Sequence, residues 1–379
     1  MITAAYLDFC ATTPVDPRVA AVVRRYMEDE FGNAGSRTHE YGLAASRAVE
    51  AARAHVAAVC DAKPEEVIFT SGATEANNLA LVGLAPHAHD SGRRHMLALA
   101  IEHKAVLDPL DSIAQSNDID VELVPVGQRG WVDPEEIQKR LRPDTVVVST
   151  MHANNETGVI QPLEEIATVL GDHVAYWHVD AAQTYGKLDG LGNRRIDLIS
   201  MSGHKLYGPM GVGALVARRR GYQRPPLSPL MFGGGQERGH RPGTVPVPLV
   251  VGMGEACRLA TIEQASRAAA CWTQRTQVTD ALSQFCPQFN GDQNKTLPHV
   301  LSVSIPELDA EAAMMILRDL VAISNGSACT SSSYEPSHVL AAMGLGSERT
   351  QGALRISWSH EPMGIDWASV TQRLSEALR

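Results

Sequence analysis

The stretch of sequence that decides the fold runs from residue 174 to residue 209 and reads VAYWHVDAAQTYGKLDGLGNRRIDLISMSGHKLYGP. It contains two short apolar runs, Val174–Val179 and Leu198–Met201, in which apolar and polar residues do not alternate. Such runs are typical of strands that are covered on both faces, as in a parallel sheet. Asp180 follows the first run, and Lys205 follows the second within a turn rich in Gly, Ser and Pro. We therefore expect two strands, each with a charged side chain at or just beyond its end.

The same pattern extends outward in both directions. Five further runs rich in Val, Ile and Leu are separated by helical patterns, at Val67–Thr70, Met96–Ile101, Val121–Val126, Thr145–Thr150 and Gly213–Ala217. One connecting segment begins Asp133-Pro134-Glu135-Glu136, which supplies an N-cap, a proline at the first helical position and acidic residues in the first turn. The alternation predicts an α/β fold with a mostly parallel seven-stranded sheet and with ligands where strands end.

The character of the sequence changes after the last of these strands. A loop rich in Gly and Pro covers residues 221–248, and a helical pattern resumes at about 249–285. Short strands such as Val300–Ile305 then alternate with helices. We expect a large domain and a smaller α+β domain, with the bounds 14–256 for the first and 1–13 plus 257–379 for the second.

Composition and charge restrict the classes of function. Hydrophobic residues make up 44% of the 379 residues, which is enough for a full core, and the formal net charge is −10. An acidic chain repels phosphate backbones and anionic lipids, so we expect no direct binding to nucleic acid or to a membrane. No apolar run reaches about 18 residues and the start lacks a basic leader, so we expect a cytoplasmic protein. The irregular spacing of the six cysteines predicts free thiols.

Asp180 and Lys205 together suggest a particular chemistry. A carboxylate at the end of a buried strand is costly unless it meets a cation. A lysine among Gly, Ser and Pro residues, just beyond an apolar run, is not a typical surface lysine. Pyridoxal phosphate needs both groups, a lysine for the Schiff base and a carboxylate against the pyridine nitrogen. An ordinary buried ion pair beside a glycine-rich turn is the alternative interpretation.

A second turn adds a candidate phosphate site. The strand Val67–Thr70 runs into Ser71-Gly72-Ala73-Thr74, and a helical pattern begins at Glu75. Small residues at a strand-to-helix turn leave backbone N–H groups available to an anion, and the helix dipole assists. The alternative interpretation is an ordinary Ser or Thr cap of the helix, without a bound phosphate.

Six motifs stand in the order and spacing of the cysteine desulfurases, which are fold-type-I pyridoxal-phosphate enzymes close to the class-V aminotransferases. They are Thr70-Ser71-Gly72-Ala73-Thr74-Glu75, Glu102-His103-Lys104, the MHANNETG run at 151–158, Asp180-Ala-Ala-Gln183, Ser202-Gly203-His204-Lys205 and Gly326-Ser327-Ala328-Cys329. The opening Leu7–Pro14 fits too. The small, polar surroundings of Cys329 resemble the long-loop subgroup, which serves iron–sulfur scaffolds and thiolation partners.

The resemblance implies a role for each matching residue. Lys205 would hold the cofactor covalently and move the Cα proton, and His103 would stack on the ring and act as an acid–base group. Cys329, in a segment that we expect to be mobile, would receive the sulfur as a persulfide. The remaining cofactor contacts would come from Ala73, Thr74, Asn155, Asp180, Gln183, Ser202 and His204, and from Thr244 of a partner subunit.

The substrate carboxylate would be bound by Asn155 and Arg355, since a guanidinium meets a carboxylate through two parallel hydrogen bonds. A salt bridge at a strand edge is the other interpretation of Arg355.

The implied reaction converts L-cysteine to L-alanine and passes the sulfur through Cys329 to an acceptor protein, in an iron–sulfur, tRNA-thiolation or DNA-phosphorothioation pathway. The implied assembly is a homodimer, because Thr244 lies on a Gly/Pro-rich loop suited to crossing between subunits. No metal site is expected. A selenocysteine lyase or another enzyme like the class-V aminotransferases would share Lys205 and Asp180, but an aminotransferase has no use for Cys329. A non-catalytic sulfur-transfer scaffold would be expected to have lost Lys205, His103 or Asp180, and all three are present.

Overall fold

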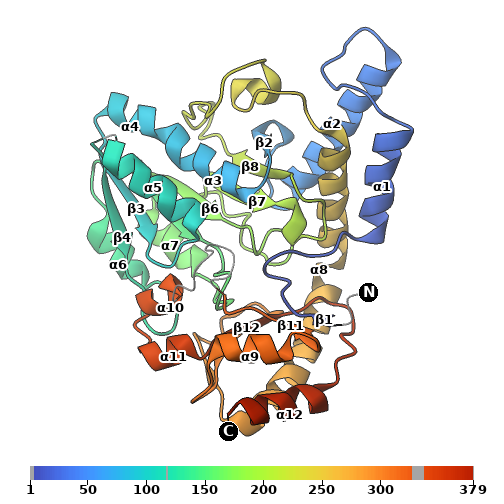
Figure 1. The fold of residues 1–379 in the computed structure, drawn as a ribbon. Helices are drawn as coiled ribbons and strands as arrows, with labels where there is room; N and C mark the ends of the chain where they lie inside the picture. Colours follow the sequence, from blue (N-terminus) through green and yellow to red (C-terminus); the bar gives the residue numbers. More distant parts are fainter. Residues whose placement is uncertain (1–3, 117, 327–336, 379) are drawn as a thin grey trace.

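The computed structural model describes residues 4–116, 118–326 and 337–378. Its centre is a seven-stranded sheet in the order β2-β8-β7-β6-β5-β3-β4 (Figure 1). Only β8 runs against its neighbours, and the other adjacent strands within the sheet are parallel. The strands are β2 Val67–Thr70, β3 His95–Leu99, β4 Asp120–Val124, β5 Thr145–Met151, β6 Tyr176–Asp180, β7 Leu198–Ser202 and β8 Gly213–Ala217. All seven predicted strands are confirmed, with ends that differ by at most two residues.

Helices cover both faces of this sheet, which explains why its strands are apolar on both sides. One face carries α3 Ala73–Leu81, α4 Ala85–Ser91 and α5 Lys104–Ser116. The other packs against α2 Glu40–Ala58, α6 Pro134–Arg140, α7 Leu163–Leu170 and the first part of α8 Val247–Leu282, with α1 Pro17–Glu28 outside α8. Helix α6 begins as predicted, since Asp133 Oδ1 accepts from the N–H of Glu135 at 3.0 Å.

A smaller layer lies below the main sheet in Figure 1. It contains the antiparallel sheet β12-β10-β9 and the parallel pair β1-β11, and α8, α9 and α12 pack around a separate apolar core. Its elements are β1 Ala5–Tyr6, β9 Gln288–Phe289, β10 Val300–Ser304, α9 Ala310–Leu317, β11 Val321–Ala322, α10 His338–Ala342, α11 Ser347–Gln351, β12 Ala353–Ser357 and α12 Trp367–Ala377.

Helix α8 joins the two layers as one continuous helix of 36 residues. It begins at Val247, two residues before the helical pattern expected from the sequence, and it runs through the expected boundary between residues 256 and 257. The division of the chain into domains with those bounds stays a prediction.

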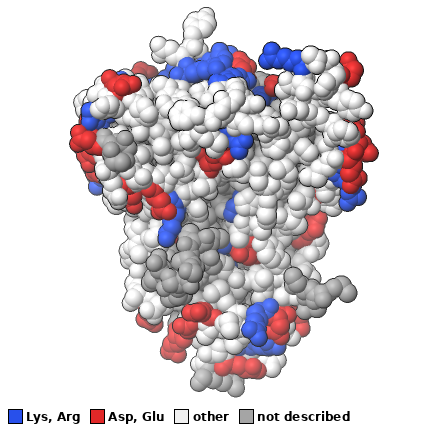
Figure 2. Space-filling view, turned by 45° about the horizontal axis from the view of Figure 1, so that its top comes forward, with Lys and Arg blue, Asp and Glu red and all other residues white. Residues whose placement is uncertain are grey.

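The surface carries charges of both signs. Figure 2 shows Lys and Arg side chains gathered at the top of one face and Asp and Glu side chains along its flanks. Within the described ranges, none of the helices combines the length and the hydropathy that crossing a bilayer requires.

Candidate active site

A cavity of about 580 Å³ lies where β5, β6 and β7 end and α3 begins. The structure brings together around it ten of the residues predicted for the site: Ala73, Thr74, His103, Asn155, Asp180, Gln183, Ser202, His204, Lys205 and Arg355. Two predicted residues are not among them. Thr244 is a described residue with an exposed side chain, and it does not line the cavity. Cys329 lies outside the described residues.

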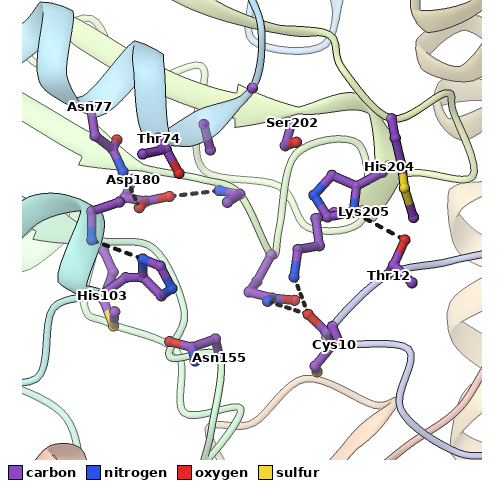
Figure 3. A pocket seen from close by; sticks show the side chains of 18 of the residues that line it. Cys10, Thr12, Thr74, Asn77, His103, Asn155, Asp180, Ser202, His204 and Lys205 are labelled. Atoms are coloured by element: carbon purple, nitrogen blue, oxygen red, sulfur yellow. Dashed lines mark hydrogen bonds between the residues drawn. The ribbon is translucent and has the colours of Figure 1, made fainter. Parts of the chain in front are cut away.

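Lys205 enters the cavity from the turn after β7 (Figure 3). Its Nζ donates to the carbonyl oxygen of Cys10, and Gln183 Nε2 donates to the same oxygen at 3.0 Å. Cys10 belongs to the N-terminal segment, which forms one wall of the cavity. Hydrogen bonds to the carbonyl of Cys10 therefore join the N-terminal segment to the turn after β7 at the predicted lysine.

Asp180 approaches from another wall, at the carboxyl end of β6. Its side chain is almost fully buried and accepts hydrogen bonds from Asn77 Nδ2 at 2.7 Å and from the N–H of Ala182 at 2.9 Å. Among the described residues, no lysine or arginine lies within ion-pair distance of it. Two neutral donors orient this carboxylate, and its charge remains available to a cation in the cavity.

His103 lines the same cavity directly before α5. Its Nδ1 accepts from the N–H of Ala105 at 3.0 Å, which fixes the ring and leaves the proton of the neutral imidazole on Nε2. Burial lowers the pKa of His103, and the positive charge of Lys205 acts in the same direction, while Asp180 opposes them. The ring is therefore neutral at pH 7. The acid–base role expected for His103 stays a prediction.

The predicted phosphate turn follows β2. Gly72 precedes α3 without any side-chain cap, so the first backbone N–H groups of the helix are left to other acceptors. Thr74, Ser202 and His204 line this part of the cavity. His204 Nδ1 lies 3.1 Å from Thr12 Oγ1, and burial together with Lys205 lowers the pKa of His204 to about 4. A bound phosphate would therefore meet hydroxyl groups, backbone N–H groups and a neutral imidazole.

Arg355 reaches the cavity from β12 and is 2% exposed. Its Nη2 donates to Asp8 Oδ1 at 2.7 Å, and its Nη1 donates to the carbonyl of Asn155 at 3.1 Å. Arg355 forms the salt bridge of one interpretation and also lines the cavity, and its role toward the substrate carboxylate stays a prediction. A carboxylate that binds Arg355 has to share or replace the contact with Asp8.

Four residues in or beside the site had no role predicted from the sequence: Asn77, Asp8, Glu102 and Thr12. Asn77 is a fully buried amide on a face of α3 whose other buried residues are apolar, and a polar residue on that face was the one signal available. Glu102 lies within a recognised motif, and its Oε1 accepts from the N–H of Met151 at 2.5 Å. Burial raises the pKa of Glu102, and the nearby charge of Asp180 raises it further. Glu102 thus supports the end of β5 through its hydrogen bond to Met151.

Residues 5–361 match the protein family described as aminotransferase class-V. The chain belongs to the class-V aminotransferase family. Within this family, the cysteine desulfurase IscS of Dechloromonas aromatica is 43% identical over 93% of this chain and 86% of its own length. DndA from Streptomyces lividans is 49% identical, with a TM-score of 0.82 over 92% of this chain and 98% of that one. SspA, solved in complex with cysteine, is 34% identical, with a TM-score of 0.83 over 93% and 98% of the two chains. The resemblance to the cysteine desulfurases is confirmed.

Class-V aminotransferases use pyridoxal 5′-phosphate, and the cavity fits this group. Gln183 Oε1 is buried and has no hydrogen-bond partner among the described residues, so a bound molecule can supply one. The uncapped start of α3 suits a phosphate, and Asp180 suits a protonated ring nitrogen. With Lys205 on the opposite side, each functional part of the cofactor has a chemically matched partner.

Proposed function

We propose that this protein is a cysteine desulfurase, which converts L-cysteine to L-alanine and transfers the sulfur through a protein thiol to an acceptor. The observation that carries the proposal is a single cavity lined by a lysine, a carboxylate without a cationic partner among the described residues, and a buried arginine: Lys205, Asp180 and Arg355. Relatives named cysteine desulfurase and a solved relative with bound cysteine support it.

Bound pyridoxal phosphate supplies an electron sink for charge that develops at the substrate Cα. Within the protein, the Asp180 carboxylate would hold a proton on the ring nitrogen, which would maintain that sink. Lys205 Nζ takes the proton from the substrate Cα and returns it on the way to alanine. The N-terminal segment at Cys10 and the ring of His103 line the cavity in which this proton moves.

Arg355 provides the affinity for the amino-acid carboxylate. Its guanidinium is buried and held by Asp8 and by the carbonyl of Asn155, so it is oriented before substrate arrives. A preoriented fork binds a carboxylate through two charge-assisted hydrogen bonds and loses little entropy in doing so. This contact selects amino acids over simple thiols.

Cys329 is the thiol that we propose to accept the sulfur. The carbonyl of Gly326 lies 3.5 Å from Arg355 Nη1 at the cavity. Cys329 follows three residues later, and three residues span at most about 11 Å. Chain length therefore allows the Cys329 thiolate to attack the substrate sulfur, which it takes up as a persulfide while the electron pair of the cleaved carbon–sulfur bond stays with the substrate carbon.

The test is to measure alanine and sulfide formed from cysteine by the wild type, by Cys329→Ser and by Cys286→Ser. Cys286 is a described, exposed cysteine and serves as the matched control. We expect Cys329→Ser to lose turnover and its trapped persulfide, and Cys286→Ser to keep both. Full turnover by Cys329→Ser, or a persulfide mapped to Cys10 by mass spectrometry, would contradict the assignment of the nucleophile.

The assembly and the acceptor are proposals as well. A homodimer in which Thr244 completes the phosphate site of the partner is supported by the exposure of Thr244, and Phe232 on the same loop is 90% exposed. Mixing Thr244→Ala subunits with Lys205→Ala subunits should restore activity through the site that receives the intact residues. Strictly monomeric behaviour in sedimentation would refute shared sites. We propose a cytoplasmic location and an acceptor protein in iron–sulfur assembly, tRNA thiolation or DNA phosphorothioation.

A further inference from the structure

The loop that carries Thr244 is fastened to its own subunit by a buried ion pair. Glu237 lies in the short 3-10 turn Gln236–Gly239, and Arg53 lies on α2. Both Nη atoms of Arg53 donate to the Glu237 carboxylate at 2.8 Å, and the two side chains are 5% and 4% exposed. The N–H of Phe69 on β2 donates to the same carboxylate at 2.8 Å. Three donors therefore fix the position of Glu237 against the strand that leads into the phosphate turn.

The backbone at this point adopts a conformation that side chains normally avoid. Glu237 and Arg238 have φ values of 45° and 58°, and Gly239 follows with 86°. Two successive residues with side chains in the left-handed region cost conformational energy, and such a turn persists only where its surroundings determine it. The hydrogen bonds of Glu237 with Arg53 and Phe69 hold the turn in this conformation.

A second ion pair fastens the loop nearer to Thr244. Arg241 Nε donates to Glu75 Oε1 at 3.0 Å, and Glu75 Oε2 accepts from the N–H of Ser71 at 2.8 Å. Ser71 and Glu75 line the cavity at the phosphate turn. Thr244 itself is exposed and makes no hydrogen bond within the described part of the chain. The loop is thus held firmly up to Arg241 and presents Thr244 outward.

We propose that the Arg53–Glu237 pair is a positioning device that sets Thr244 against the phosphate site of a second copy of this chain. Arg241 and Glu75 assist by fixing the same loop to the phosphate turn of their own subunit. Through the Arg53–Glu237 and Arg241–Glu75 pairs, the phosphate turn of each subunit is then linked to the Thr244 that this subunit donates to its partner. The inference rests on the proposed shared site, and it adds the residues that hold the donated threonine in place.

The experiment measures the Kd of the apoprotein for pyridoxal phosphate, from the change in cofactor absorbance, in Thr244→Ala, Glu237→Gln and the double variant. We expect each single change to raise the Kd about tenfold above the wild-type value. The Kd of the double variant should also be raised only about tenfold, because both changes act on one contact. Two independent losses would multiply to about 100-fold. The dimer dissociation constant, measured by sedimentation, supplies a second readout.

Asp197→Asn is the matched control. Asp197 is also a buried carboxylate, and it accepts from a strand N–H, that of Trp177 at 2.7 Å, and from Arg195 and Arg220. Asp197 lies at the other end of the sheet. Asp197→Asn alone should leave the wild-type Kd unchanged, and added to Thr244→Ala it should leave the Kd of that variant unchanged. If Glu237→Gln does not fold, Arg241→Gln replaces it, because Arg241 is less buried than Glu237 and holds the same loop.

The outcomes separate the inference from the proposal beneath it. An unchanged Kd in Thr244→Ala removes the shared site and the positioning device together. A weakened Thr244→Ala with an unchanged Glu237→Gln, or with a double variant about 100-fold weaker, overturns the positioning device alone. A control that loses cofactor as Glu237→Gln does would assign both carboxylates to general stability and also overturn it.

Discussion

Two buried carboxylates at opposite ends of the main sheet have different surroundings. Asp180, at the carboxyl end of β6, is held by an amide and a backbone N–H. Asp197, just before β7 at the other end, accepts from the N–H of Trp177 and forms ion pairs with Arg195 and Arg220 at 3.0 and 2.7 Å. The charge of Asp197 is satisfied within the protein, whereas that of Asp180 faces a cavity. The contrast distinguishes a structural carboxylate from one that is placed to receive a ligand.

The largest effect is expected at the cavity end. Asp180→Asn keeps the size of the side chain and removes its charge, so a protonated ring nitrogen bound as we propose would lose its counter-charge. We expect kcat for alanine formation to fall by about 100- to 1000-fold, with an altered absorbance of the bound cofactor and little change in the thermal unfolding midpoint. Steady-state kinetics with an unfolding scan on the same sample makes the measurement.

Asp197→Asn should show the reverse. Loss of this carboxylate leaves two arginines without their buried partner, and breaking such a group costs about 3 kcal/mol of unfolding free energy. We expect kcat and KM to stay near the wild-type values at a temperature where the variant is folded. Equal losses of activity in the two variants, at equal folded fraction, would refute the distinction between the two ends of the sheet.

Arg355 sharpens the comparison, because it is an arginine at the cavity end whose carboxylate partner, Asp8, we propose is exchanged for the substrate carboxylate. Arg355→Ala should lower kcat/KM for cysteine by a factor that corresponds to about 1.5–3 kcal/mol of lost transition-state binding. The absorbance of the bound cofactor should stay almost unchanged. Parallel loss of cofactor and activity would show that the Asp8–Arg355 pair is structural, as the pairs of Asp197 are.

The smallest effect concerns His178, in the middle of β6, the strand that ends at Asp180. His178 lies between Ser149 Oγ at 2.8 Å and Ser200 Oγ at 2.9 Å, and burial lowers its pKa to about 4. Because the folded pKa is below the ordinary value of about 6.5, the unfolded chain takes up a proton first as the pH falls. His178 therefore favours folding fully above pH 6.5, and this contribution declines toward pH 4 by at most about 1.4 kcal/mol per pH unit.

His178→Asn should remove that part of the pH dependence. Urea unfolding of the two proteins at pH 7, 6 and 5 gives the comparison. The difference in unfolding free energy should shrink as the pH falls. A difference that stays constant over this range would mean that His178 titrates alike in the folded and unfolded chains.

The sequence predicted the parts of this site that depend on local pattern. Apolar runs located the strands, and parallel strands bring Asp180 and the turn of Lys205 to the same edge of the sheet. The pairs Arg53–Glu237 and Asp8–Arg355 were not predictable, since each joins residues that are far apart in the chain and nothing in the local pattern selects the partner. The support of Asp180 by Asn77 depends likewise on how α3 packs against β6.

We propose that the cofactor of this cavity binds covalently to Lys205. Reduction of the protein with borohydride in the presence of pyridoxal phosphate, followed by proteolysis and mass spectrometry, locates the bound cofactor. We expect reduced pyridoxal phosphate on the peptide that contains Lys205, and its loss in Lys205→Ala. A label on Lys187 or Lys104, or an unlabelled protein that still forms alanine from cysteine, would show that Lys205 does not hold the cofactor.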